Sequence, residues 1–260
     1  MHPMLNIAVK AVRRSSIVLS RFSLDLERVN ISRHLINEYA DEACRLAEET
    51  AKRVILTAYP DHAISLDGNF GDLKNHKGFL WVICPIDGLI NFAYGFPFYA
   101  ISISLIQNGN ILQSVVYDPV RNDLFTSRRG SGTFLNDRRI RVSGQISFSN
   151  SLIGDGSDHI DINDAPFNNK IITGCLSTRR IGSVALGLAY VACGRLDGFY
   201  GCSSLDRKYL AAGSLMVSEA GGLVTDFNGD QDWLQSRQII AATPKIFTLF
   251  KNYINKILVK

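Results

Sequence analysis

Several features that would assign the protein to a specialised class are scarce or missing. No stretch of the 260 residues approaches the roughly 18 consecutive apolar residues of a membrane-spanning helix. The net charge is only +4 and long basic blocks are lacking, which argues against a nucleic-acid-binding surface. The five cysteines are widely spread without a C-x-x-C pair, so we expect reduced thiols. Since the first basic residues follow the N-terminal apolar stretch, unlike in a secretory signal, we predict a cytoplasmic protein without membrane contacts.

What is present is typical of a globular protein, with 46% hydrophobic and 20% charged residues. Apolar spacing predicts helices over 4–22 and 41–58, the second ending at Tyr59-Pro60. The period then changes to that of strands, which we predict at 78–84, 99–119 and 123–143. The middle range is a hairpin that turns at Asn108-Gly109-Asn110. The first part is therefore predicted to be two helices followed by a largely antiparallel sheet.

The second part alternates strands and helices. Short strands are predicted at 150–156, 170–177, 197–201, 223–229 and 238–243. Helices are predicted at 182–194, at 204–222 and from Pro244 onward, the first two ending at glycine caps. A polar stretch at 142–150 separates the two parts, so we predict divisions at 1–145 and 146–260 within one compact unit.

The stretch "WVICPIDGLINF" (81–92) concentrates features of a site. One carboxylate, Asp87, stands between Pro85 and Gly88 at the end of an apolar run, and Cys84 stands three residues before it. We interpret this as a loop that aims side chains at a ligand. Asp87 either retains cation binding or closes an Asx-type turn. Asp206, at the start of a predicted helix, is favoured as its N-cap over a relocated metal ligand.

Four blocks of the chain, in order, resemble the inositol monophosphatase family. "WVICPIDGLINFAYGFPFYAISISL" is similar to the family signature W-x-x-D-P-[IL]-D-G-T-x-N-F and the strand that follows it. "VVYDPVRNDLFTSRRGSGTFLNDRRIRVS" resembles the family's central hairpins, and "RRIGSVALGLAYVACGRLDGFY" resembles the region before its second signature. "AAGSLMVSEAGGLVTDFNG" resembles the end of that second signature, W-D-x-A-A-G-x-x-[IL]-[VI]-x-E-A-G-G. The bacterial extragenic-suppressor branch of the family is the most similar.

The resemblance implies an α/β (α+β) fold, a layered αβαβα sandwich. It also implies Mg²⁺-dependent hydrolysis of inositol or sugar monophosphates, in which two or three ions bind the phosphate and activate water. Mg²⁺ prefers oxygen ligands in octahedral geometry. Two such ions about 4 Å apart need a bridging carboxylate to offset their repulsion.

Matched to the family pattern, this chain keeps only part of the metal site. The resemblance implies metal ligation by Asp67, Asp87 and the backbone carbonyl of Ile86. Four other positions have lost the expected group: Cys84 replaces the bridging aspartate, Leu89 the motif threonine, Tyr209 the aspartate of the W-D pair, and Cys44 the aspartate that partners the threonine. Because several charge-stabilising groups are lost together, we expect Mg²⁺ binding and catalysis to be weakened or absent.

The positions that the resemblance assigns to substrate binding are also altered. Gly88, Gly182 and Ser183 are retained at positions that the resemblance assigns to substrate, but Val184 replaces an alanine and a glutamate near Cys202 is missing. Cys44, Cys84 and Cys202 are expected to line the former site. Their thiols either hold a soft metal such as Zn²⁺ or, as we favour, fill the space left by lost acids.

Three functions stay open from the sequence. In the first, the chain is a weakened or inactive family member kept for its interactions. The resemblance to this branch implies that these interactions are with Nus factors or RNA polymerase. Alternatively it is a slow Mg²⁺-dependent inositol monophosphatase that uses Asp67 and Asp87 on a small phosphorylated polyol or sugar. A degenerating remnant is the third reading, which the intact core pattern disfavours. The family is often dimeric, so we expect a homodimer.

Overall fold

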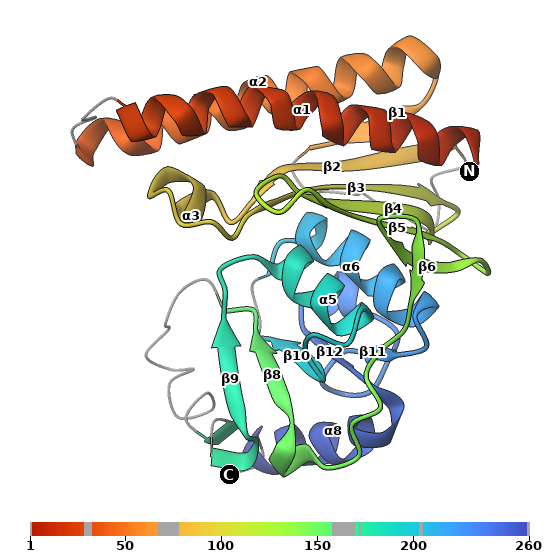
Figure 1. Ribbon diagram of the computed structural model, residues 1–260. Helices are drawn as coiled ribbons and strands as arrows, with labels where there is room; N and C mark the ends of the chain where they lie inside the picture. The colour runs from red at the N-terminus through yellow and green to blue at the C-terminus, as the bar shows by residue number, and fades with distance from the viewer. Residues whose placement is uncertain are drawn as a thin grey trace.

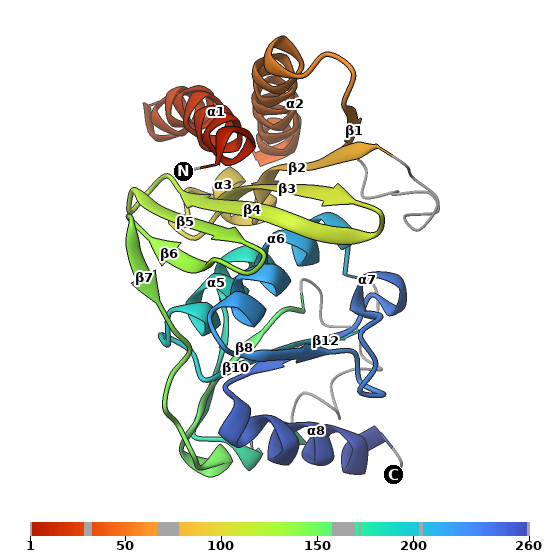
Figure 2. The same cartoon turned by 90° about the vertical axis from the view of Figure 1, so that its right-hand side faces the viewer.

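The computed structural model describes residues 2–28, 33–66, 78–157, 170–171, 173–202 and 205–258. Helices and sheets alternate in five stacked layers (Figures 1 and 2). From one outer layer to the other these are the pair α1 and α2, a seven-stranded sheet, the pair α5 (Val184–Ala192) and α6 (Arg207–Glu219), a five-stranded sheet, and α8 (Pro244–Leu258). The predicted αβαβα sandwich is therefore confirmed.

Helices α1 (Pro3–Arg28) and α2 (Arg33–Ala58) form a long antiparallel hairpin over one face of the first sheet (Figure 1). Both predicted helices are present but longer than expected, and α2 begins eight residues earlier than the predicted Asp41. The buried positions of α2 repeat every three or four residues and are mostly alanine: Ala40, Ala43, Ala47, Ala51 and Ile55. Small side chains let two helices approach closely, and Ser15 of α1 donates a hydrogen bond from Oγ to the Ala47 carbonyl at 2.7 Å.

The first sheet follows the chain order from β1 to β7. Its strands are β1 (Ala63–Ser65), β2 (Phe79–Asp87), β3 (Ala100–Gln107), β4 (Asn110–Asp118), β5 (Asp123–Arg128), β6 (Gly132–Leu135) and β7 (Arg138–Ile140). All neighbours are antiparallel except β1 and β2, which are parallel. The predicted hairpin turn is confirmed, because Asn108 and Gly109 both have positive φ, at 49° and 74°.

Strand β2 is buried on both faces, which explains its unbroken apolar run. Trp81 and Ile83 belong to the core beneath α1 and α2. Leu80 and Val82, which alternate with them, pack instead with Ala211 and the neighbouring turn of α6. The strand that carries the metal-loop sequence is thus held between two helical layers.

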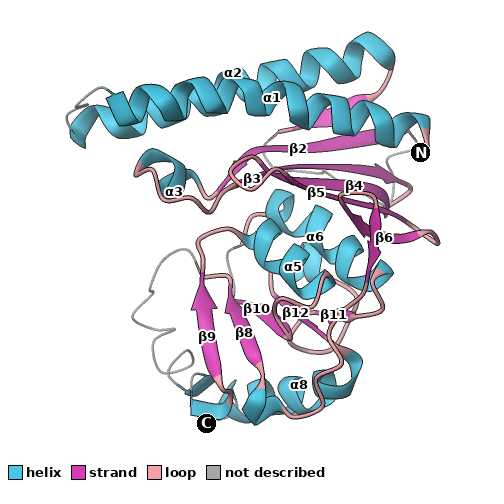
Figure 3. Cartoon of the chain, viewed as in Figure 1, coloured by secondary structure: helices cyan, strands magenta, loops and turns pink. Residues whose placement is uncertain are grey.

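The second sheet has the order β11, β12, β10, β8, β9 and lies between the middle helices and α8 (Figure 3). Its strands are β8 (Leu152–Asp155), β9 (Ser177–Arg180), β10 (Gly198–Gly201), β11 (Leu223–Thr225) and β12 (Ile239–Ala242), with the short helices η1 (Phe148–Asn150) and α7 (Trp233–Ser236) beside them. Four of the five predicted strands are confirmed. The strand predicted at 170–177 is wrong.

The described residues of 170–174 are helical, and the strand begins only at Ser177. The apolar residues Ile171 and Cys175 are four apart, as on one helical face, and both are buried near α8. Strand β9 is polar instead, since it lies at the sheet edge beside β8. Among the described residues, no helix is both long and apolar enough to cross a lipid bilayer.

Candidate functional site

The C-terminal end of β2 is a bulged strand, which corrects the expected loop. Its pairing with β3 shifts between Cys84, opposite Ser102, and Asp87, opposite Ala100. Three steps along β2 are therefore matched by two along β3, and the extra residue turns the strand end towards the middle helices. Ile86, whose backbone carbonyl is one of the predicted metal ligands, is buried in the core beneath α1 and α2.

Asp87 is buried, with 3% of its surface exposed, and its carboxylate caps the start of α5. Oδ2 accepts hydrogen bonds from Ser183 Oγ at 2.9 Å and from Ala185 N at 2.5 Å. Oδ1 accepts from Val184 N at 3.3 Å. A carboxylate at a helix N-terminus is stabilised by unpaired N–H groups and by the helix dipole. Sequence reasoning weighed a local turn against cation binding and missed this long-range contact, which nothing in the local sequence indicates.

The three predicted substrate positions lie together beside this cap. Gly88 has φ of 96°, and a Cβ there would come within 2.9 Å of the Gly182 carbonyl oxygen. Ser183 both donates to Asp87 and, as the N-cap of α5, accepts from Leu186 N at 3.3 Å. The backbone approach at Gly88 therefore leaves no room for a side chain.

Asn91 holds the same junction together, a role that sequence reasoning assigned only to turn formation and packing. Its Nδ2 donates to the carbonyls of Phe98 and Ile181, both at 2.7 Å. One side chain of α3 (Leu89–Ala93) thus joins the start of β3 to the segment before α5.

The positions that lost polar groups have joined the apolar core. Cys84 is fully buried, and Cys44 and Leu89 pack against the core beneath α1 and α2. Burial, followed by the charge of Glu48, raises the pKa of Cys44 to about 11. Burial, followed by the charge of Asp87, raises the pKa of Cys84 well above its ordinary value. Both groups are neutral thiols at pH 7, so neither is an activated nucleophile.

The start of α6 places two charged side chains, those of Asp206 and Lys208, within electrostatic range of Cys84. Asp206 is the N-cap as predicted, and its Oδ1 accepts from Lys208 N at 3.1 Å. Its Oδ2 lies 3.3 Å from Lys208 Nζ. Tyr209, at the predicted position of a lost metal ligand, is partly buried against the core around α5 and α6.

The expected cluster of three cysteines does not form. Cys84 and Cys44 interact electrostatically, but Cys202 packs in a separate core with Phe148, Tyr200 and other residues near α8. Within the described ranges, no group of three or more His, Cys, Asp or Glu side chains is arranged to hold a metal ion. Asp67, the other predicted carboxylate ligand, lies outside the described residues.

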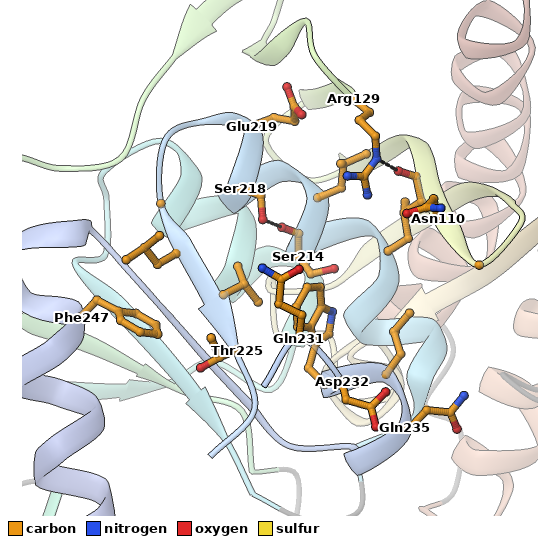
Figure 4. Close-up of a pocket in the computed structure, with 18 residues that line it drawn as sticks. Asn110, Arg129, Ser214, Ser218, Glu219, Thr225, Gln231, Asp232, Gln235 and Phe247 are labelled. Atoms are coloured by element: carbon orange, nitrogen blue, oxygen red, sulfur yellow. Dashed lines mark hydrogen bonds between the residues drawn. The ribbon is translucent and has the colours of Figure 1, made fainter. Parts of the chain in front are cut away.

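A cavity of about 540 Å³ lies away from this site, between the β3–β4 turn, α6 and α7 (Figure 4). It is lined by Asn110, Arg129, Ser214, Trp233 and others, and the buried Nε1 atom of Trp233 has no hydrogen-bond partner among the described residues. Register places it at the opposite end of β3, because Phe79 pairs with Gln107 whereas Asp87 pairs with Ala100. The cavity is therefore distinct from the metal-loop region.

The layered fold is shared with solved structures of related proteins. The extragenic suppressor protein SuhB of Bartonella henselae superposes with a TM-score of 0.86 at 31% identity, over 98% of this chain and 99% of that one. Residues 1–257 match the inositol monophosphatase family, and the chain belongs to that family. It is similar to Nus factor SuhB of Pseudomonas aeruginosa, at 40% identity over 95% of this chain and 94% of that protein. The inositol-1-monophosphatase of Mesorhizobium japonicum is 35% identical over 94% of this chain and 92% of that protein.

Proposed function

We propose that this SuhB-like member of the inositol monophosphatase family acts without Mg²⁺-dependent phosphatase chemistry, as a partner of transcription complexes. One observation carries the proposal. Asp87 is the single carboxylate among the predicted metal positions in the described part of the chain, and both of its oxygens already accept hydrogen bonds from the start of α5. Its contacts account for its retention without a metal.

The other groups at these positions do not fit a pair of Mg²⁺ ions. Mg²⁺ prefers carboxylate, carbonyl and water oxygens, and two adjacent ions need a shared anion. Cys84 offers a buried neutral thiol where the resemblance implies the bridging acid, and Leu89 offers no oxygen from its side chain. We propose no reaction step through a metal on this donor set.

The relatives support the transcription role. The protein from Pseudomonas aeruginosa that is 40% identical is named a Nus factor, and so is that of Pasteurella multocida, 38% identical over 99% of this chain. Such a role needs surfaces rather than metal ligands. We propose Nus factors or RNA polymerase as the partners, in the cytoplasm.

Phosphate release from inositol-1-phosphate with Mg²⁺ tests the loss of chemistry. We expect the unaltered chain to release no more phosphate than its Asp87→Asn variant, with both shown to be folded by circular dichroism at the assay temperature. Release at a rate ordinary for the family, abolished in the variant, would instead establish the alternative phosphatase that uses Asp67 and Asp87.

Complex formation tests the transcription role separately. The purified chain is passed over a gel-filtration column with the Nus factors and RNA polymerase of its own organism, with and without EDTA. We expect co-elution that EDTA does not change. Separate elution from all of them would contradict the partner role and leave the loss of chemistry standing.

We also propose a homodimer that forms through apolar side chains around α3. Tyr94 and Phe96 are 61% and 50% exposed, and Phe96 stacks on Phe98, which lies under the Arg121 guanidinium. Sedimentation of the Tyr94→Glu/Phe96→Glu variant should show a monomer. Leu176→Glu, at an equally exposed apolar residue of the other half, should leave the dimer intact, and an unaltered chain that sediments as a monomer would refute the proposal.

A further inference from the structure

Lys208 is held by contacts from its own helix end. Its ammonium lies 3.3 Å from Asp206 Oδ2, and the other oxygen of the same carboxylate accepts the Lys208 backbone N–H. The ammonium also lies 5.4 Å from the centre of the Tyr209 ring, within the range of a cation–π contact. Only 21% of the side chain is exposed. The ammonium is thus held by one ion pair and one cation–π contact, and most of the side chain is buried.

The fixed ammonium faces the positions where the family pattern has metal ligands. Helix α6 and helix α2 both pack on β2, which brings Lys208, Cys44 and Cys84 to one junction. Both thiols lie within electrostatic range of the ammonium, and Cys84 also interacts with Asp87 and Asp206. The ion pair with Asp206 stabilises the charged form of Lys208, so the side chain is a cation at neutral pH.

The junction keeps two carboxylates: the start of α5 hydrogen-bonds Asp87, and the ion pair with Lys208 compensates the charge of Asp206. In a metal-dependent relative, divalent cations supply the positive charge at this place. In this chain a lysine side chain reaches the same junction from the residue beside the lost metal ligand at Tyr209.

We propose that the Lys208 ammonium is a built-in cation that replaces the metal ions of this site and keeps divalent ions out. The inference rests on the proposed loss of metal chemistry and extends it. It predicts that replacing the lost acids alone does not restore the site, because an entering Mg²⁺ would meet the positive charge of the mostly buried Lys208 side chain. Restoration requires the lysine to be neutralised as well.

Mn²⁺ binding, followed by the electron paramagnetic resonance of the free ion, tests the proposal on full-length chains. The first chain carries Cys84→Asp, Leu89→Thr and Tyr209→Asp. The second carries these and Lys208→Met, which keeps the length of the side chain and removes its charge. The third carries these and Lys208→Arg, which keeps the charge. We expect the second chain to bind Mn²⁺ at least tenfold more tightly than the other two, and equal affinities in all three would overturn the proposal.

The single variants keep the test decisive if the multiply substituted chains do not fold. Lys208→Met alone should lower the thermal midpoint in low salt, whereas Lys208→Arg should leave it nearly unchanged. Identical midpoints for both would overturn the inference. Failure of the proposed function has a different signature, namely tight Mn²⁺ binding by the unaltered chain.

Discussion

Two carboxylates connect the middle helices to the first sheet. One belongs to a strand of the sheet and binds a helix, and the other belongs to a helix and binds the sheet. Asp87 reaches from the end of β2 to the start of α5, where Ser183, Val184 and Ala185 donate to it. Glu219 reaches from the end of α6 to the turn between β5 and β6. It accepts from Gly130 N at 2.8 Å and from Gly132 N at 2.9 Å.

The two contacts differ in burial and in origin. Asp87 is buried, while Glu219 is half-buried and the Gly130 end of its contact is exposed. Asp87 stands in a sequence that resembles a metal motif, whereas Glu219 does not bind metal in that pattern. Yet both make the same kind of contact with backbone N–H groups. The comparison teaches that Asp87 has a structural role that would outlast the loss of a metal, which Cys84, Leu89 and Tyr209 do not share.

Removing the Asp87 carboxylate should have the largest effect. Asp87→Ala leaves three donors in the interior without an acceptor, and we expect a loss of about 3 kcal/mol in the free energy of unfolding. Urea unfolding measures it as a lower midpoint with an unchanged m-value. Asp87→Asn keeps the size and one acceptor oxygen, so it should lose about half as much. Unchanged midpoints for both variants would mean that the carboxylate is not a structural cap.

Removing the Glu219 carboxylate should have a smaller effect. In Glu219→Ala, water can reach the exposed Gly130 N–H, so we expect a loss of about 1 kcal/mol by the same urea titration. Glu49→Ala, at an exposed acid on α2, provides the matched control and should lie within about 0.5 kcal/mol of the unaltered chain. If Glu219→Ala lowers the free energy of unfolding as much as Asp87→Ala does, the difference in burial does not determine how much each contact contributes.

The layers, most elements and the family could be predicted from the sequence, because periodicity and capping are local. The apolar run of β2 and the Asn108-Gly109 turn are examples, and each depends on a few neighbouring residues. The described residues of 170–174 are helical where the sequence predicts a strand, since Ile171 and Cys175 fit a short apolar run of either type.

The contacts of the candidate site could not be predicted in the same way. Asp87 and Ala185 are 98 residues apart, and Gly130 and Glu219 are 89 apart, so no local pattern links them. The position of Lys208 depends likewise on how α6 packs against β2. The substitutions at the motif positions can be read from the sequence. The contacts that these positions now make can be seen only in the folded structure.

The other end of β2 relies on a neutral acceptor, the imidazole of His62, and this contact should depend on pH. Trp81 Nε1 donates to His62 Nδ1 at 3.0 Å, and the imidazole stacks on Tyr59 with ring centres 4.7 Å apart. Burial lowers the pKa of His62, more than the nearby Asp61 raises it. The unfolded chain, with a histidine pKa near 6.5, then binds more protons than the folded chain, so this contribution to stability is present above about pH 6.5 and is lost as the pH falls through the lower folded value.

Lowering the pH from 7.5 to 5.5 should therefore reduce the urea midpoint of the unaltered chain slightly more than that of His62→Gln. We expect the smallest of the three effects here, because the imidazole is only partly buried. A midpoint that falls equally in both chains would show that Nδ1 of His62 does not need to stay unprotonated for the folded chain to be stable.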